Sequence, residues 1–349
     1  MKMTIQQRVK SIWEKILMRW LLPGKLRVLP TTLTIELTNH CSLACSCCPN
    51  GCDRSHCRPR HTLSLTDMQR LLTQIDVPFN RVFLHLHGEP FLVKDLPAIV
   101  RLLIDRGVHE FVLFSNAYQI DVGLLDQLLD VVAGHQFHIC FSAELYSQRT
   151  YESLRQPGRF EIVWQSMEQI DAVMARHDRR YSVNAIIDPQ AIDSLKDTVP
   201  PIFQRLHQLK DIHFSSAFPW PHLPQTGHIA GHLNTRRNVC SQMTELPTIL
   251  SSGQVTMCSS DFRGECIVGS LWEQKYSELI NNPTARRFRR NIALRKPARN
   301  LPCRNCLIDR HQPFSRIVNR KFIDKADETM LEKYFTKFHT YFNLDDVQI

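Results

Sequence analysis

The chain has 349 residues, which is enough for one large domain or for a core domain with a smaller one. Hydrophobic residues make up 43% and charged residues 22%, so a substantial core can form, and no stretch is long and apolar enough to span a bilayer. The sequence contains neither internal repeats nor low-complexity tracts, which excludes repeat architectures.

The formal net charge of +9 favours anionic partners such as nucleic acid, acidic lipid or acidic small molecules. However, the charges are spread along the chain, and the densest basic run has little aromatic interleaving. That run consists of Arg286, Arg287, Arg289, Arg290, Arg295 and Lys296. We therefore expect no nucleic-acid partner, whereas an anionic small-molecule substrate is compatible with the charge.

Residues 1–29 contain a basic amphipathic helix pattern over residues 7–21. Basic side chains interrupt the apolar run that a signal peptide would need. Such a helix can lie on a membrane surface or pack on its own domain, and we favour packing over peripheral membrane contact. Without a secretion signal, we expect a cytoplasmic protein, in which disulfides are rare.

Apolar segments alternate with helical patterns from residue 30 to residue 218. The expected strands are residues 33–37, 82–86, 111–114, 137–141, 183–187 and 212–214. The expected helices are residues 66–75, 96–106, 122–132, 160–176 and 192–206. This alternation predicts an α/β fold with a parallel sheet, and six such units would form a partial (β/α)6 barrel. Active sites in these folds lie at the carboxyl ends of the strands.

The pattern changes after about residue 217, where Pro219, Pro221 and Pro224 indicate a linker. Residues 219–315 contain five further cysteines, and we interpret this segment as a small cluster-bearing domain. Its cysteines are Cys240, Cys258, Cys266, Cys303 and Cys306. We expect residues 316–349 to form a charged, mainly helical tail, to which the sequence assigns no function.

Half of the twelve cysteines lie in one short stretch, at Cys41, Cys45, Cys47, Cys48, Cys52 and Cys57. A chain of this length without a secretion signal is not a disulfide scaffold, so we expect metal or cluster ligation. Cys41-x3-Cys45-x2-Cys48 directly follows the first expected strand. Three thiolates on one loop can bind three irons of a [4Fe–4S] cluster and leave the fourth iron open. A zinc site built from four of the six cysteines is the alternative.

The sequence around these cysteines resembles the radical S-adenosylmethionine (SAM) superfamily. The resemblance rests on residues 41–48 and on four later features: His87-Gly88-Glu89-Pro90, Ser115-Asn116-Ala117, Ser142 and Arg155. It implies that Cys41, Cys45 and Cys48 hold a [4Fe–4S] cluster. The reduced cluster would cleave SAM to a 5′-deoxyadenosyl radical, which abstracts a hydrogen atom from the substrate.

The same resemblance implies a set of SAM contacts. Gly88 and Glu89 would hold the methionine amino group, because a carboxylate accepts hydrogen bonds from an ammonium. Ser142 and Arg155 would hold the methionine carboxylate, for which a guanidinium is a well-suited partner. Asn116 would lie near the cofactor at a strand end.

Three positions depart from the family pattern. Cys47 stands where an aromatic residue usually packs on adenine, and His87 and Ala117 stand where glycines are common. These differences bear on the adenine contacts and not on the cluster. Cys47, Cys52 and Cys57 receive no role, and spare thiols are the default interpretation.

The later cysteines resemble the SPASM/twitch extensions of radical SAM enzymes. Cys240-x12-Gly253-x4-Cys258 is followed by Cys303-x2-Cys306. The resemblance implies that the four thiolates bind one auxiliary [4Fe–4S] cluster, because no cysteine follows Cys306 in this chain. A four-cysteine zinc site is the alternative, and Cys266 is either a substitute ligand or spare.

A second cluster could serve as the electron acceptor of an oxidation. A substrate radical that loses a proton and an electron is oxidised by two electrons, and a nearby cluster can accept that electron. We therefore expect a radical SAM oxidoreductase that dehydrogenates a small molecule such as a sugar or aminocyclitol, as twitch enzymes of similar architecture do. Reduction of the first cluster calls for a flavodoxin- or ferredoxin-type electron donor.

Two other functions stay open at this stage. One is a radical SAM maturase that modifies a peptide or protein, although the short segment before the first strand is too small for a peptide-binding domain with its own core. The other is a non-catalytic zinc-binding protein. The catalytic base is not determined, and Glu144, Asp188 and His213 are candidates at or near strand ends.

Overall fold

The computed structural model describes residues 24–26, 28–52, 58–217, 240–293, 302–304, 306 and 315–339. The helix expected at residues 7–21, the proline linker and Cys57 lie outside these residues. None of the described helices combines the length and the apolar character that a membrane crossing requires.

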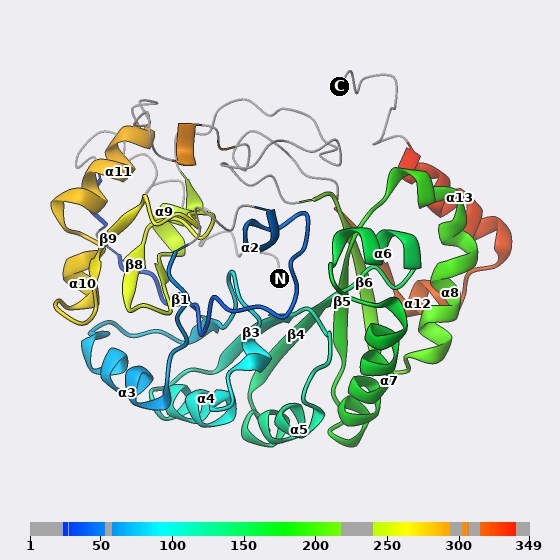
Figure 1. Cartoon of the computed structure of the whole chain (residues 1–349), viewed down its shortest axis with the longest axis horizontal. Coiled ribbons are helices and arrows are strands. Elements are labelled where there is room, and N and C mark those ends of the chain that lie inside the picture. Colours follow the sequence, from blue (N-terminus) through cyan, green and yellow to red (C-terminus); the bar gives the residue numbers. More distant parts are fainter. Residues whose placement is uncertain are drawn as a thin grey trace.

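Six parallel strands form the centre of the molecule and are hydrogen-bonded in their sequence order. They are β1 (Thr32–Ile35), β2 (Arg81–Phe83), β3 (Glu110–Ser115), β4 (Gln136–Ser142), β5 (Tyr181–Ile186) and β6 (Leu209–Ser215). Figure 1 shows them as an open arc. The expected α/β fold with a partial barrel is confirmed.

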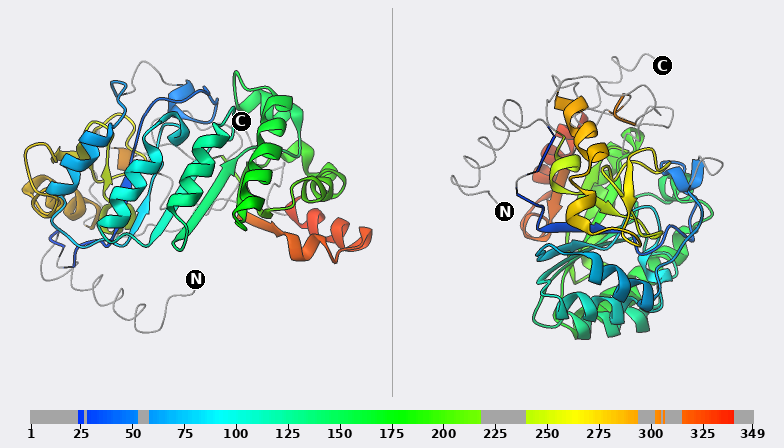
Figure 2. Two further views of the ribbon diagram at one scale, coloured as in Figure 1. Left: turned by 90° about the horizontal axis from the view of Figure 1, so that it is seen from below. Right: turned by 90° about the vertical axis from the view of Figure 1, so that its left-hand side faces the viewer.

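Helices cover the convex side of this arc (Figures 1 and 2). They are α3 (Leu65–Gln74), α4 (Leu96–Asp105), α5 (Val122–Val131), α7 (Phe160–Arg176) and α8 (Leu195–Arg205). A capping box between Ser64 and Asp67 starts α3. Between β2 and β5, two short elements were not expected, because one or two turns give no readable period: α6 (Gln148–Leu154) and the 3-10 helix η2 (Pro90–Leu92). The 3-10 helix η3 (Pro189–Ser194) overlaps the start of the helix expected at residues 192–206.

The two faces of the sheet differ in character. Side chains alternate along a strand, and on β4 and β5 those that face the helices are apolar and buried, as Phe141 and Val183 illustrate. The alternating positions carry short polar or sulfur side chains that are partly exposed: Cys140, Ser142, Ser182 and Asn184. Parallel strands that are buried on both faces read as continuous apolar runs. The concave face of β4 and β5 is therefore more polar than the face that packs on the helices.

The C-terminal third extends the sheet at both edges. On one side β7 (Thr248–Ile249) pairs in parallel with β1, followed by β8 (Gln254–Thr256) and β9 (Ile267–Ser270) in antiparallel pairing. On the other side β10 (Ser315–Asn319) pairs antiparallel with β6. The expected helical tail thus begins with a strand.

The remaining helices belong to these two extensions. They are α9 (Ser241–Glu245), α10 (Tyr276–Leu279), α11 (Pro283–Ala293) and η4 (Pro302–Arg304) beside β7–β9, and α12 (Arg320–Ile323) and α13 (Glu328–His339) after β10. α13 packs on α8 and η3. Arg320 anchors the tail, because its guanidinium donates to the main-chain carbonyls of Phe203, Leu206 and Leu209.

Candidate active site

The three cysteines of the first motif lie on the loop that follows β1. This loop leads into the short helix α2 (Pro49–Cys52) on the concave side of the sheet (Figure 1). Main-chain hydrogen bonds shape it, from the Cys48 amide to the Cys45 carbonyl at 3.1 Å and from the Ser46 amide to the Leu154 carbonyl at 2.9 Å. Cys45 is only 8% exposed, whereas Cys41 and Cys48 are half-buried.

The protein environment disfavours the thiolate forms of Cys41 and Cys48. Burial, together with the neighbouring Glu89 and Cys45, raises the pKa of Cys41 to about 11. Burial and the other cysteines raise the pKa of Cys48 well above its usual range. Cations that bind such thiols release their protons and form thiolate bonds. Cluster ligation by Cys41 and Cys48 would therefore release protons.

Among the described residues, no three histidine, cysteine or carboxylate side chains converge as the ligands of one metal ion do. In a cubane cluster, by contrast, each cysteine thiolate binds its own iron.

Gly88 and Glu89 lie directly against the cysteine loop. A Cβ atom at Gly88 would lie 2.2 Å from the Thr38 carbonyl oxygen, so only glycine allows this approach. Glu89 is buried, and its carboxylate accepts from the Phe91 amide at 3.1 Å and from the Asn116 amide at 2.7 Å. Burial nevertheless raises the pKa of Glu89 to about 7. A cationic group beside Glu89 would stabilise its ionised form.

Asn116 connects the end of β3 to the cysteines. Its Nδ2 atom lies 3.5 Å from Cys41 Sγ and 3.3 Å from Ser42 Oγ. The next residue, Ala117, has a φ of +58°, which explains why glycine is frequent at this position in the family. The structure thus brings the Cys41 thiol, Asn116 and Glu89 together, as expected.

Arg155 is also at the site, but it is already paired. Its guanidinium makes two hydrogen bonds to the fully buried Glu144 carboxylate, at 2.9 and 2.7 Å, and its Nη1 lies 3.9 Å from Cys45 Sγ. Burial opposes the charge of Arg155, but Glu144 outweighs this effect and raises its pKa well above the usual range. Glu144 is therefore a counter-ion and no longer a candidate base.

The structure also shows where the other two candidate bases lie. Asp188 caps η3, where it accepts from the Gln190 amide at 3.0 Å and from the Thr150 hydroxyl at 3.2 Å. His213 lies on β6 with its side chain 38% exposed. Of the three candidates, His213 alone stands on one of the strands that line the concave face.

Cys47, which replaces the usual aromatic residue, reaches the far strands. It packs against the small apolar cluster of Leu154, Ile186 and Ala217, beside the carboxyl ends of β5 and β6. Burial raises the pKa of the Cys47 thiol to about 12. The side chain at this position thus contributes apolar surface where the family has an aromatic ring.

One buried network of polar side chains was not predicted from the sequence. Glu36, just after β1, is fully buried, and Arg58 donates to both of its oxygens, at 3.0 and 2.7 Å. His87 Nδ1 lies 3.2 Å from the same carboxylate, and the Ser251 hydroxyl donates to it at 2.9 Å. The only sequence signal is an acidic residue in an otherwise apolar strand segment. The network joins the cysteine loop, the Gly88 segment and the C-terminal extension.

We expect this network to make the protein acid-sensitive. Burial alone would raise the pKa of Glu36, but His87 and Arg58 outweigh it and lower the pKa to about 2. A lowered pKa stabilises the fold above the unfolded value of about 4.5, and this contribution of about 3 kcal/mol is lost as the pH falls toward 2. Unfolding of wild type and Glu36→Gln, followed by circular dichroism between pH 7 and pH 2, should show a deficit of the variant that shrinks below pH 4.5.

Glu168→Gln is the matched control, because the Glu168–Arg205 pair is exposed and worth at most about 1 kcal/mol. A deficit of Glu36→Gln that stays constant down to pH 2 would contradict the expected linkage.

The C-terminal cysteines gather in a second place. Burial, followed by the neighbouring Cys240 and Cys303 thiols, raises the pKa of Cys258 well above its usual range. The fully buried Cys266 hydrogen-bonds to the Cys303 thiol, which raises the pKa of Cys266. Cys306 is half-buried and lies between residues that are not described. Electrostatic contacts thus link Cys258 to two other expected ligands, Cys240 and Cys303, and a hydrogen bond links Cys266 to Cys303.

Two residues organise this second site. The buried Asp261 carboxylate accepts from the Thr256 hydroxyl at 2.9 Å and from the Cys266 amide at 2.6 Å, which fixes the loop after Cys258. Gly253 turns the β7–β8 hairpin with a φ of +79°, and a Cβ atom there would lie 2.3 Å from the Trp272 ring. Its place in the cysteine motif is therefore a requirement of the turn.

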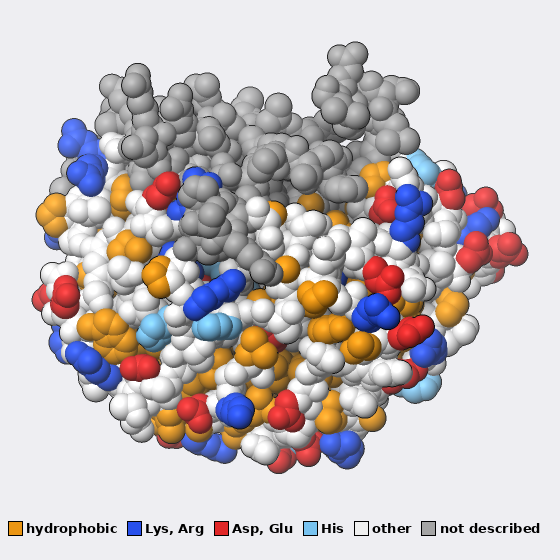
Figure 3. Space-filling model, viewed as in Figure 1, with side chains coloured by type: hydrophobic (Ala, Val, Ile, Leu, Met, Phe, Trp, Pro, Cys, Tyr) orange, Lys and Arg blue, Asp and Glu red, His pale blue; other side chains and the backbone are white. Residues whose placement is uncertain are grey.

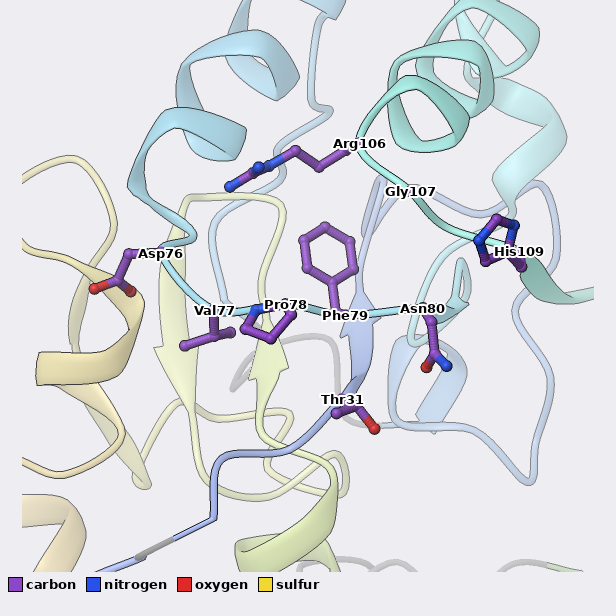
Figure 4. A pocket seen from close by; sticks show the side chains of 9 residues that line it. All are labelled: Thr31, Asp76, Val77, Pro78, Phe79, Asn80, Arg106, Gly107 and His109. Carbon is purple, nitrogen blue, oxygen red and sulfur yellow. The ribbon is translucent and has the colours of Figure 1, made fainter.

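A separate hollow opens at the opposite end of the sheet (Figure 4). Its volume is about 540 Å³, and Thr31, Asn80 and His109 line it, each directly before a strand. Ligands of parallel sheets bind at the carboxyl ends of the strands, so this hollow is not the active site. On the face shown in Figure 3, acidic and basic side chains are interspersed, in agreement with the scattered charge of the sequence.

Comparison with known proteins identifies the family. The sequence matches the Radical SAM superfamily over residues 35–187, and it matches SPASM, described as an iron-sulfur cluster-binding domain, over residues 240–307. The chain belongs to the radical SAM superfamily. Its cofactors are accordingly a [4Fe–4S] cluster with SAM and, in the SPASM domain, auxiliary iron–sulfur ligation. For this radical SAM enzyme, the family matches support iron–sulfur ligation over the zinc site of the alternative interpretation.

Solved structures share the fold. The crystal structure of BtrN in complex with AdoMet and 2-DOIA is 16% identical, with a TM-score of 0.50 over 77% of this chain and 89% of BtrN. Native anSMEcpe with bound AdoMet is 12% identical, with a TM-score of 0.55 over 74% of this chain and 82% of anSMEcpe. These identities establish likeness of fold alone. No curated protein matches the sequence.

Proposed function

We propose that this radical SAM enzyme is an oxidoreductase that dehydrogenates a hydroxyl-bearing carbon of a small molecule such as a sugar or aminocyclitol. When bound, the cofactors supply the 5′-deoxyadenosyl radical and a one-electron acceptor. The ligands that we assign are Cys41, Cys45 and Cys48 for the SAM-binding cluster, and Cys240, Cys258, Cys303 and Cys306 for the auxiliary cluster.

The protein's own groups hold SAM in this proposal. Gly88 lets the backbone approach, and the buried Glu89 carboxylate accepts from the methionine amino group. Ser142 and Arg155 bind the methionine carboxylate. Asn116, which lies within 3.5 Å of Cys41 Sγ, orients the cluster loop.

In this proposal, side chains on the concave face of the sheet determine which substrate binds. Ser142 on β4 pairs with Asn184 on β5, which pairs with His213 on β6, so three polar side chains stand in one row. Hydroxyl, amide and imidazole groups match the hydroxyls of a polyol. Phe114 on β3 is 36% exposed, and its ring offers an apolar surface for the C–H groups of such a ligand.

The fold itself accommodates more than one substrate class. BtrN was solved with AdoMet and 2-DOIA, and anSMEcpe with AdoMet and a peptide, the latter at 13% identity and a TM-score of 0.51 over 90% of this chain and 97% of anSMEcpe. Peptide modification is thus the alternative, and the short polar side chains of the row favour the small molecule. A flavodoxin- or ferredoxin-type donor in the cytoplasm would reduce the first cluster.

The test is anaerobic turnover of the reconstituted enzyme with SAM and dithionite. Candidate substrates are myo-inositol, scyllo-inosamine, glucosamine and a cysteine-containing peptide. We expect one polyol to increase 5′-deoxyadenosine formation and to give a product lighter by two hydrogen atoms. Stimulation by the peptide alone, with a modified peptide as product, would replace this proposal by the maturase.

A further inference from the structure

His213 of the polar row is paired with Asp211, a residue that has no role so far. His213 Nε2 lies 2.8 Å from the Oδ1 atom of Asp211, two residues earlier on the same strand. Asp211 is 6% exposed, whereas the His213 side chain is 38% exposed. A buried carboxylate therefore stands behind an imidazole that is open to the concave face.

Asp211 fixes the state of the imidazole. Burial would favour the neutral acid, but hydrogen bonds from His213 and Ser182 outweigh burial and keep the pKa of Asp211 below its usual range. The Nζ atom of Lys210, 3.7 Å from Oδ2, adds to this effect. An ionised carboxylate only accepts hydrogen bonds, so Nε2 carries the proton. In the neutral imidazole, the lone pair of His213 then resides on Nδ1.

The register of the sheet places His213 beside the expected SAM contacts. His213 pairs with Asn184, and Asn184 pairs with Ser142. Ser142 and Asn116 directly follow the paired residues Phe141 and Ser115 at the ends of β4 and β3. A ligand that contacts the whole row would therefore extend from Ser142, an expected SAM contact, to the imidazole of His213.

We propose that His213, held by Asp211, accepts the hydroxyl proton of the substrate. This inference rests on the proposed function. With the cofactors bound, the substrate C–H bond would give its hydrogen atom to the 5′-deoxyadenosyl radical that they supply, and the O–H proton would pass to His213 Nδ1. The auxiliary iron–sulfur cluster would accept the remaining electron, so the carbinol would become a carbonyl with atoms and electrons balanced. His213 is the catalytic residue, and Asp211 is a positioning residue.

The first measurement needs no substrate. Histidine side-chain ¹⁵N NMR of the full-length protein, with His213→Phe to assign the signal, should show the Nε2–H tautomer in wild type. Asp211→Asn should shift this tautomer equilibrium, because an amide can also donate. A wild-type His213 that carries its proton on Nδ1 would overturn the proposal, since no lone pair would then face the substrate.

The second measurement uses the polyol probes myo-inositol, scyllo-inosamine and glucosamine, deuterated at carbon. His213→Phe should still transfer deuterium into 5′-deoxyadenosine, whereas carbonyl product should fall by at least ~100-fold. Asp211→Asn should lower product less. The control is His138→Phe, which changes an exposed histidine on the concave face of β4. This variant should keep the wild-type ratio of carbonyl product to deuterated 5′-deoxyadenosine.

The outcomes separate the two proposals. If wild type makes product and His213→Phe keeps the same ratio of product to 5′-deoxyadenosine, the role of His213 is refuted while the dehydrogenase stands. If wild type oxidises none of the three probes, the dehydrogenase fails, and the proton acceptor fails with it.

Discussion

The variant Cys41→Ala/Cys45→Ala/Cys48→Ala is expected to yield no 5′-deoxyadenosine from SAM under anaerobic reduction. In our assignment these three thiolates are the protein ligands of the first cluster, so their removal would leave SAM no open iron to bind. The auxiliary cysteines lie on other segments and should keep their iron. Iron and acid-labile sulfide analysis should therefore show partial cluster content, and chromatography should show loss of SAM cleavage to background.

Cys52→Ala is the control for this experiment. Cys52 ends α2, four residues after Cys48, and its exposed thiol donates to the Cys48 carbonyl at 2.9 Å. We expect this variant to keep wild-type iron content and SAM cleavage. SAM cleavage that survives in the triple variant would disprove the ligand assignment.

The second large effect concerns the pair of Arg155 and Glu144. Both side chains are buried, so Arg155→Met would leave the Glu144 carboxylate charged without its counter-ion, which costs about 3–5 kcal/mol. We expect the midpoint of thermal unfolding, measured by circular dichroism, to fall markedly.

The double variant Arg155→Met/Glu144→Met tests the cause. Because it removes both charges, most of the lost stability should return, whereas SAM affinity should remain low because the methionine carboxylate has lost its guanidinium. If the double variant is no more stable than Arg155→Met, the stability loss does not come from an unpaired Glu144. If it binds SAM like wild type, Arg155 is not a SAM contact.

Local signals in the sequence predicted much of the fold. The apolar segments and 3.6-residue periods led to all six parallel strands and five helices, and α7 has the expected bounds. The expected second strand was too long. β2 ends at Phe83, and the chain then turns to the cysteine loop, where the Glu89 amide donates to the His40 carbonyl at 2.8 Å. A contact between segments about fifty residues apart leaves no periodic trace.

The sequence predicted which segments lie close together at the candidate site. Cys41, Glu89 and Asn116 meet as expected, because their segments all lie at the carboxyl ends of adjacent strands. The ion pairs were not predictable. Glu144 was a candidate base until the structure showed Arg155 beside it, and the bonds from Arg58 and Ser251 to Glu36 join residues that are remote in sequence.

The flanking strands pair with both edge strands of the partial barrel. An exposed strand edge offers unpaired amides and carbonyls to other chains and promotes aggregation. Here β7 covers the edge of β1, and β10 covers that of β6. Both covering strands come from the C-terminal third of the chain. The edges of the six parallel strands are therefore covered only after nearly the whole of this sequence has been synthesised, and a chain truncated after β6 would expose the edges of β1 and β6.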